Sequence, residues 1–205
     1  MKRTITALLT IATMMLATPT FASTIYPSFG DSISVSMDTL AVGYTGEIDV
    51  DIIGKGSSTT PDFITFCVEH NYSINIGSTY TVNGTSKSTD GAPITSLNPY
   101  TAYLYNSFVN GTLPITTATQ AQQLQQAIWW LQGDHTNGVN NTYVSQATTA
   151  NWTNTGNVYI LDMGANVQDL LIIQPTPTPE PSTLILLGAG IIGAAIIRKK
   201  VKKQA

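Results

Sequence analysis

The spacing of apolar residues changes twice along this chain, and this pattern limits the fold more than any other feature. Residues 32–53, SISVSMDTLAVGYTGEIDVDII, alternate apolar and polar side chains over much of their length, which predicts β-strands. Residues 98–134 instead repeat apolar side chains at the spacings of a helix. From residue 157 the spacing returns to that of strands. We therefore expect strands, then a helical insert, then closing strands.

Turn-forming and capping residues divide these regions into individual elements. Short apolar runs predict further strands, and Pro, Gly, Asn and Thr mark loops and helix ends. The expected strands lie within 32–53, 63–68, 79–82, 157–163 and 166–173, the expected loops are 54–62 and 83–93, and the expected helices lie within 98–111, 116–134 and 142–152. The predicted fold class is α+β, an antiparallel β-sheet or partial barrel with a helical insert of two to three helices.

The first 22 residues have the composition of a secretory signal peptide. Lys2 and Arg3 precede an apolar run over residues 5–17, and small residues flank an expected cleavage site after Ala22. The apolar run is too short for a membrane anchor, and the cleavage pattern follows it directly. We therefore expect residues 1–22 to be removed and the remainder to be exported.

The other end of the chain has three parts. A Pro/Thr spacer covers residues 174–182, an apolar helix is expected over 183–197, and five basic residues follow within the segment 183–205. The basic residues favour a cytoplasmic end, so the preceding domain would face outward. An apolar helix of this length spans only about 22 Å, less than the hydrocarbon core of a bilayer. We expect a temporary membrane insertion through this helix.

The motif Pro179-Glu180-Pro181-Ser182, followed by the apolar helix and the basic cluster, resembles the PEP-CTERM sorting signal of exopolysaccharide-producing Gram-negative bacteria. The resemblance implies an exosortase as partner, a membrane transpeptidase that would cut near Pro181. It also implies a final location in the cell envelope, on the outer surface or in the extracellular matrix. The alternative is an ordinary C-terminal single-span anchor.

Charge is distributed unevenly between the ends and the middle. All 12 acidic residues lie between Asp31 and Glu180, whereas seven of the nine basic residues lie in the two targeting segments. The middle keeps only Lys55 and Lys87, which gives it a formal charge of −10. Such a surface repels nucleic acid and anionic lipid headgroups, so neither is expected as a partner.

Cys67 is the only cysteine of an exported chain, and an oxidising compartment leaves such a thiol exposed to reaction unless its sulfur is occupied. It lies in Phe66-Cys67-Val68-Glu69, and a downstream helix contains Leu124-Gln125-Gln126-Ala127-Ile128-Trp129. These two motifs resemble those of the thioester domain of bacterial surface adhesins. The resemblance implies a bond between the Cys67 sulfur and the Gln125 side chain, and it assigns residues 23–173 as a thioester-like adhesion domain. Leu124 and Glu69 stand where that family has threonine and aspartate.

The physical requirements of such a bond agree with the expected elements. An amide is a poor electrophile, so a thioester forms from glutamine only by enforced proximity at a site that polarises the carbonyl. A strand and a helix are stiff holders for the two partners. Phe66, Trp129 and Trp130 are expected to shield the bond from water. An amine or a hydroxyl on a partner protein or polysaccharide would then attack and become attached.

Other interpretations of these residues remain open. Cys67 on its own is more typical of a buried core thiol, and Gln125 on its own is typical of a helix surface residue. A cysteine hydrolase is disfavoured, because Cys67 and His70 are three apart on a strand and point to opposite faces, and because His135 is expected in an exposed loop. Glu47, Asp49 and Asp51 are interpreted as a solvated strand face, and Asp134 with Asn137 as a turn, so no metal site and no cofactor is expected.

Two functional hypotheses follow from these observations. The first is an exported surface or biofilm-matrix protein that attaches covalently through a Cys67–Gln125 thioester and acts once, without enzymatic turnover. The second is a noncatalytic structural protein of the exopolysaccharide matrix in which Cys67 is reduced and buried.

Overall fold

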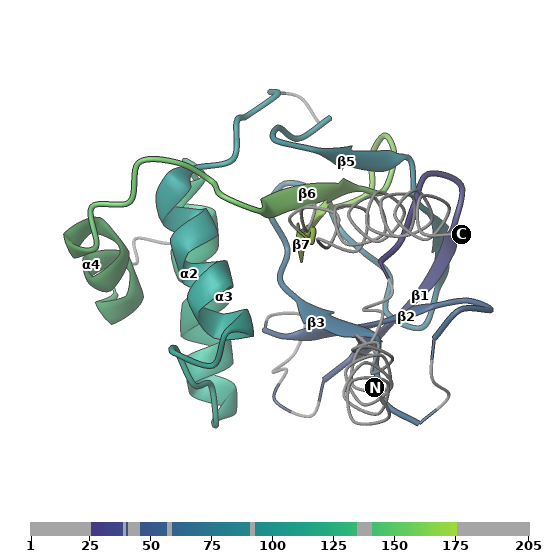
Figure 1. Cartoon of the computed structure of the whole chain (residues 1–205), viewed down its shortest axis with the longest axis horizontal. Helices are drawn as coiled ribbons and strands as arrows, with labels where there is room; N and C mark the ends of the chain where they lie inside the picture. The colour runs from purple at the N-terminus through teal and green to yellow at the C-terminus, as the bar shows by residue number, and fades with distance from the viewer. Residues whose placement is uncertain are drawn as a thin grey trace, which may run out of the picture.

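The computed structural model describes residues 26–38, 40, 46–56, 59–90, 93–134 and 141–175. The expected signal peptide and sorting tail lie outside these ranges. Within them, two antiparallel sheets and three helices form the mixed α and β architecture that the apolar spacing predicts (Figure 1). None of the helices in the described ranges is long and apolar enough to cross a membrane.

The first sheet has four strands in the order β3-β2-β1-β4. Its strands are β1 (Ser32–Met37), β2 (Ile48–Ile52), β3 (Phe63–Thr65) and β4 (Thr79–Thr81). In β1, Ile33 and Val35 lie opposite Ile52 and Val50 of β2, and all four are buried. The alternation in the sequence therefore places one apolar face of this sheet in the core, as predicted.

The second sheet has three strands in the order β5-β6-β7, namely β5 (Gly84–Ser86), β6 (Val158–Asp162) and β7 (Leu170–Ile173). The prediction of a loop over residues 83–93 is wrong for β5. This strand consists of Gly, Thr and Ser, and it exists because it pairs with β6, Thr85 lying opposite Leu161. Tertiary pairing thus overrides a local composition typical of turns.

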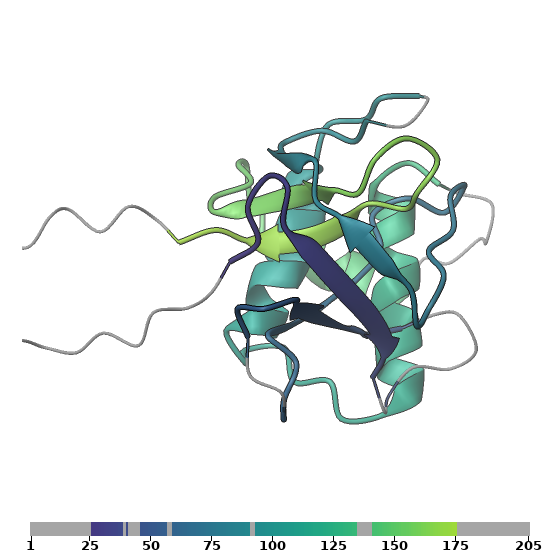
Figure 2. The ribbon, with the colours of Figure 1, turned by 90° about the vertical axis from the view of Figure 1, so that its right-hand side faces the viewer.

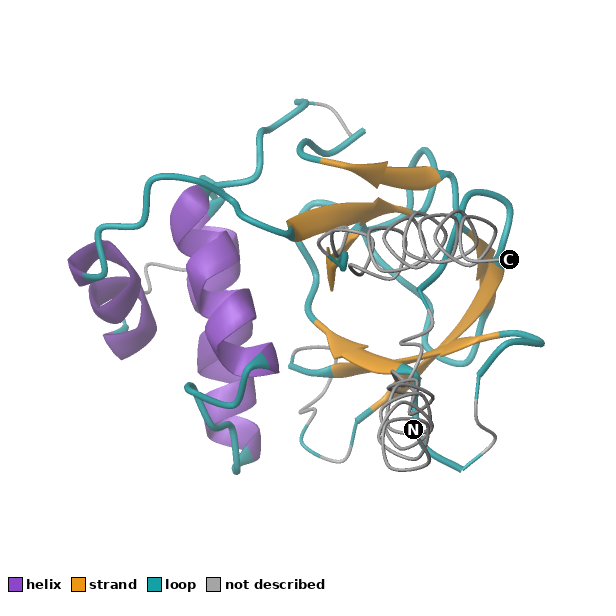
Figure 3. Cartoon of the chain, viewed as in Figure 1, coloured by secondary structure: helices purple, strands orange, loops and turns teal. Residues whose placement is uncertain are grey.

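The helical insert lies on one side of the two sheets (Figures 1 and 3). Its helices are α2 (Pro99–Val109), α3 (Ala118–Leu131) and α4 (Thr142–Thr149). Each begins at a predicted type of cap, since Asn98, Thr117 and Asn141 accept hydrogen bonds from backbone N–H groups of the first turn. The two ends of the described chain leave the domain on the same side, as Figure 2 shows.

The buried apolar residues form two clusters that meet along the chain segment 66–68. One cluster packs the helices against β6 and β7 and contains Phe66 and Val68, and the other fills the space between the two sheets and contains Cys67. This segment continues from β3, which pairs with β2, to an isolated bridge between Cys67 and Leu170 of the second sheet. The predicted strand 63–68 therefore passes from one sheet to the other.

Candidate functional site

Cys67 is buried at the junction of the two sheets, with 4% of its surface exposed. It lies opposite Leu170 as a pair that exchanges no hydrogen bonds, because the flanking bonds run from Val68 N to Asp169 O (2.9 Å) and from Leu171 N to Phe66 O (3.0 Å). The N–H and C=O groups of Cys67 itself consequently point away from β7. They need partners from another element.

Gln125 of α3 supplies both partners. Its Oε1 accepts a hydrogen bond from the Cys67 backbone N–H (2.9 Å), and its Nε2 donates one to the Cys67 carbonyl oxygen (2.8 Å). The side chain is 1% exposed, so the interpretation of Gln125 as a helix surface residue is wrong. The structure thus brings together the two residues that the thioester motif singles out.

The position of Gln125 follows from the way α3 is built. Thr117 caps the helix in a reciprocal capping box with Gln120, which fixes where the helix begins. Ala121, Leu124, Gln125 and Ile128 then share the buried face at helical spacing. Gln125 is the polar member of an otherwise apolar stripe, and Cys67 satisfies its amide through both hydrogen bonds.

Burial controls the protonation of the thiol. Burial raises the pKa of Cys67 well above its usual range, and the nearby Glu69 carboxylate raises it further. Burial also raises the pKa of Glu69, whose Oε2 accepts a hydrogen bond from Asp169 N at 3.4 Å. The charge of Glu69 acts on the Cys67 thiol, so the two groups lie close to each other. At neutral pH the thiol therefore keeps its proton.

The residues expected to shield the site divide between the two clusters. Trp129 packs in the same cluster as Cys67 and is 8% exposed. Phe66 belongs to the other cluster, where its ring meets Phe108 edge to face at 5.2 Å, and Trp130 packs against that cluster. Other apolar side chains that share the cluster of Cys67 were not indicated by the motifs, because they come from distant strands and loops. Those from β6, β7 and the loop between them are Leu161, Met163, Leu170 and Ile172.

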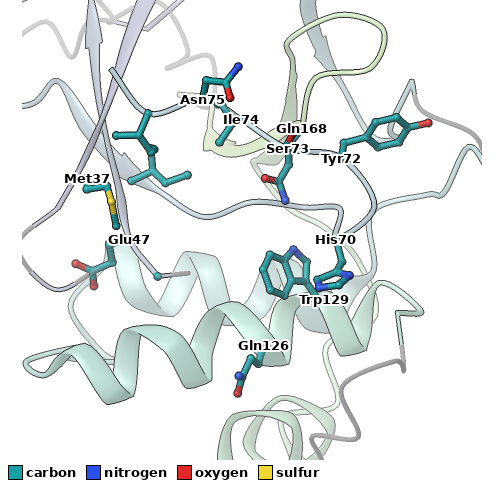
Figure 4. A pocket seen from close by; sticks show the side chains of 13 residues that line it. Met37, Glu47, His70, Tyr72, Ser73, Ile74, Asn75, Gln126, Trp129 and Gln168 are labelled. Carbon is teal, nitrogen blue, oxygen red and sulfur yellow. The ribbon is translucent and has the colours of Figure 1, made fainter. Parts of the chain in front are cut away.

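A cavity of about 600 Å³ lies beside this cluster, and we refer to it as the Trp129 cavity. Figure 4 shows Met37 and Glu47 on one side of it, and Trp129 with His70 and Gln168 on the other. Among the described residues, its lining consists of Met37, Gly46, Glu47, Ile48, His70, Tyr72, Ser73, Ile74, Asn75, Ile76, Gln126, Trp129 and Gln168.

The end of α3 orders the wall of the Trp129 cavity. Gly133 has a φ of +101°, and the N–H of Asp134 donates to Trp129 O at 3.0 Å, which is the hydrogen-bond pattern of a Schellman motif. This turn brings Asp134 Oδ2 to 3.0 Å from His70 Nδ1. The His70 ring in turn packs edge to face on Trp129, with ring centroids 4.8 Å apart. His70 is therefore engaged by Asp134 and Trp129, and His135 lies outside the described residues.

The acidic side chains near the site are less exposed than predicted. Glu47 is only 3% exposed, so the prediction of a solvated strand face is wrong for this residue. Burial raises the pKa of Glu47 to about 7 and that of Asp49 to about 6, with further contributions from the charge of Asp38. Asp49 and Asp51 are half-buried, on the face of β2 opposite its buried apolar side chains.

A second acidic group was not foreseen from the sequence, since its members come from distant segments. Carboxylate oxygens of Asp90, Asp162 and Asp169 lie within 4.8 Å of one another. Burial is the main reason that the pKa of Asp169 is raised to about 7, and the charges of Glu69 and Asp90 add to it. Asp169 Oδ1 accepts a hydrogen bond from Met163 N at 3.1 Å, so protonation of this group is coupled to the loop between β6 and β7.

Both lysines of the domain are engaged elsewhere. Lys55 Nζ lies 2.6 Å from Asp31 Oδ2. Lys87 Nζ donates to Gly156 O at 2.8 Å and lies 3.5 Å from the centroid of the Tyr159 ring. Neither of these amines lines the Trp129 cavity.

Comparison with known proteins identifies the tail of the chain. The PEP-CTERM protein-sorting motif matches residues 177–200, which include Pro179, Glu180, Pro181 and Ser182. No curated protein and no solved structure matches the chain. The motif marks a protein that is exported to the cell envelope of Gram-negative bacteria and sorted by an exosortase. The activity of the domain itself has to be argued from the site.

Proposed function

We propose that the domain carries an internal thioester between Cys67 Sγ and Gln125 Cδ, through which the exported protein attaches covalently to an amine or hydroxyl on a partner surface. The observation that carries this proposal is the pair of hydrogen bonds between the Gln125 amide and the Cys67 peptide groups. The two groups that face each other across such a pair of hydrogen bonds, here the Cys67 Cα and the Gln125 amide carbon, lie about 5 Å apart. Formation of the S–C bond requires the sulfur, which is two bonds from the Cys67 Cα, to rotate toward this amide carbon.

The same hydrogen bonds favour the chemistry of bond formation. The Cys67 N–H donates to Gln125 Oε1 and so stabilises the negative charge that develops there when the sulfur attacks. The S–C bond forms, the C–N bond of the amide breaks, and Nε2 leaves as ammonia with the thiol proton. Glu69, whose charge acts on the Cys67 thiol, is the group suited to carry that proton from sulfur to nitrogen.

Release of the thioester uses the partner molecule as nucleophile. An amine or hydroxyl attacks Cδ, the C–S bond breaks, and the incoming proton returns to Cys67. The protein is then joined to its partner through the former Gln125 side chain, and the reaction occurs once per molecule. The engaged state of Lys55 and Lys87 supports this function, because free internal amines would consume the thioester.

A specific observation also favours the noncatalytic alternative. The raised pKa of Cys67 keeps the thiol protonated, and a protonated thiol is a weak nucleophile. In this alternative the protein is a structural component of the extracellular matrix, and Gln125 serves only to satisfy the Cys67 backbone. The two functions therefore differ in the chemical state of one sulfur.

The intact mass of the exported chain distinguishes the two functions. A thioester makes the chain one ammonia lighter than its sequence requires, and methylamine treatment adds the full mass of methylamine. The deficit should disappear in Cys67→Ala and in Gln125→Ala and persist in Gln123→Ala, an exposed position on the same helix. A full sequence mass together with a thiol that reacts under native conditions would refute the thioester.

Processing of the tail is tested separately. We propose that the exosortase cleaves near Pro181, which would remove the apolar segment and release or transfer the domain. Mass spectrometry of the protein in envelope and matrix fractions should find C-termini close to Pro181. An intact C-terminus at Ala205 in the mature fraction would contradict this cleavage.

A further inference from the structure

The helical insert carries almost no charge, although the domain as a whole is strongly acidic. Among the described residues 93–134 and 141–156, the only charged side chain is that of Asp134, which lies 3.0 Å from His70. Charged residues make up about a quarter of a typical globular domain. Depletion of charge on a surface that also carries aromatic rings is typical of a binding surface. This composition indicates that the insert contacts an uncharged partner.

A hollow of about 500 Å³ lies on the insert where α4 packs against α2, and we refer to it as the α4 hollow. In Figure 1, α4 lies at the outer edge of the insert, on the side away from the two sheets. All of the lining side chains except the half-buried Tyr103 are exposed, so a ligand can reach them. Among the described residues, the lining consists of Tyr103, Thr142, Ser145, Gln146, Thr149 and Ala150.

The polar wall of the α4 hollow follows from the amphipathic pattern of α4. Thr142, Ser145, Gln146 and Thr149 recur at the spacing of one helix face, opposite the buried residues of this helix. Thr149 Oγ1 donates a hydrogen bond to Ser145 O at 2.8 Å, which leaves the oxygen of this hydroxyl able to accept. The wall therefore offers hydroxyl and amide groups, which can both donate and accept.

An aromatic pair lies beside these polar groups. The ring of Tyr103 from α2 meets the ring of Trp152, which follows α4, edge to face with centroids 5.3 Å apart. Both side chains are half-buried, so part of the ring surface is exposed. Such rings present an apolar body together with a polar tip. The α4 hollow thus combines ring surface with hydrogen-bonding groups.

The lining narrows the class of ligand. Since no charged residue is among the described lining residues, neither an anion nor a cation finds a partner of opposite charge. A protein interface needs an apolar core, and none of the large exposed apolar residues in the described ranges lines the hollow. A sugar has hydroxyls that donate and accept, and its C–H face packs on aromatic rings. The described large exposed apolar residues are Phe29, Ile53, Ile94 and Val109.

We propose that the α4 hollow binds a neutral sugar unit of a polysaccharide. The C–H face of the sugar packs on the exposed ring surface of Tyr103 and Trp152, and its hydroxyls hydrogen-bond to Ser145 and Gln146 on α4. The binding is noncovalent and reversible, and it does not depend on the thioester.

Calorimetric titration of the exported chain tests the α4 hollow. The neutral probes are cellohexaose, mannohexaose and the hexamer of N-acetylglucosamine, and hexagalacturonate is the anionic probe, each at about 10 mM. We expect at least one neutral oligosaccharide to bind and hexagalacturonate not to bind. The bound sugar should be released on dilution, which separates this binding from covalent attachment.

Variants assign the binding to the hollow. Gln146→Arg places a bulky charged side chain in it, and should weaken binding by at least about tenfold. Thr148→Arg is the matched control, because it adds the same side chain at an exposed position of α4 outside the lining, and it should bind as the parent does. Trp152→Leu removes one ring and should weaken binding by about threefold to tenfold.

Several results would overturn the proposal. These are the absence of binding by all three neutral probes, binding of hexagalacturonate in their place, and equal binding by Gln146→Arg and Thr148→Arg. Self-association of the exported chain in sedimentation analysis, abolished by Gln146→Arg, would instead assign the hollow to a second copy of the chain. A thioester mass deficit without sugar binding refutes this inference alone, and sugar binding without the deficit refutes the proposed function alone.

Discussion

Replacement of Cys67 by alanine has very different costs in the two proposed states of the sulfur. In a noncatalytic protein the substitution removes one buried sulfur atom, a loss of about 1 kcal/mol of packing free energy. In the thioester protein it also removes a covalent link between residues that are 58 positions apart. A cross-link that closes a loop of that length lowers the entropy of the unfolded chain. In the chain-entropy treatment this raises the free energy of unfolding by about 4 kcal/mol.

The predicted loss in the free energy of unfolding is therefore about 5 kcal/mol with a thioester and about 1 kcal/mol without one. Urea unfolding of the exported chain, followed by tryptophan fluorescence, measures this difference. Methylamine provides an internal check, because it opens the link while Cys67 stays in place. It should destabilise the wild-type chain by about 4 kcal/mol and leave Cys67→Ala unchanged.

A small effect of the substitution would refute the reasoning. If Cys67→Ala loses only about 1 kcal/mol and methylamine does not shift the wild-type transition, no cross-link constrains the unfolded chain. Val68→Ala is the matched control in the same segment, since it removes buried apolar atoms without touching the link. Its loss should be the same before and after methylamine treatment.

Two further predictions concern Gln125 and Asp169. In a Cys67→Ala background, Gln125→Leu leaves a buried N–H and a buried C=O without partners, so we expect a loss of about 2 to 6 kcal/mol in urea unfolding, whereas the exposed Gln123→Leu should change stability by less than about 0.5 kcal/mol. Equal effects of the two substitutions would contradict the role of the Gln125 amide. For Asp169, the folded state raises the pKa from 3.8 to about 7, so the folded chain binds a proton that the unfolded chain has released between about pH 4 and pH 7. Stability should therefore fall as pH rises through this range, by about 4 kcal/mol for this group, and Asp169→Asn should flatten the slope. A stability that rises with pH over the same range, or a slope that Asp169→Asn leaves unchanged, would contradict it.

The sequence predicts this fold well where the spacing of apolar residues determines an element. It predicts the fold poorly where an element forms only because it pairs with another strand. The helix face with Ala121 and Leu124 follows directly from spacing, and that spacing also includes Gln125, whose burial the composition alone does not suggest. The polar strand β5 is formed by its neighbour β6, so no local pattern reveals it. Glu47 precedes the first paired residue of β2, where alternation no longer indicates which side chains face water.

The candidate site shows the same division. Motif spacing identifies Cys67 and Gln125, and the structure joins them through two hydrogen bonds. The carboxyl groups of Asp90 and Asp169 come together from segments far apart in sequence, and so do the His70 and Trp129 rings that line the cavity. Such groupings arise from tertiary structure and have no signature in a single segment.

The hydrogen bonds of Gln125 are needed in both proposed functions, so they do not by themselves distinguish them. Cys67 pairs with β7 on one side. On the other side the Gln125 amide hydrogen-bonds to the N–H and C=O groups of Cys67, as a neighbouring strand would. Any residue other than proline at position 67 would use those bonds, because they involve only its backbone. What the structural alternative leaves unexplained is the choice of a thiol, since alanine or valine would fill an apolar cluster without the risk of oxidation in an exported protein. The thiol, rather than the glutamine, is therefore the group whose chemical state decides the function.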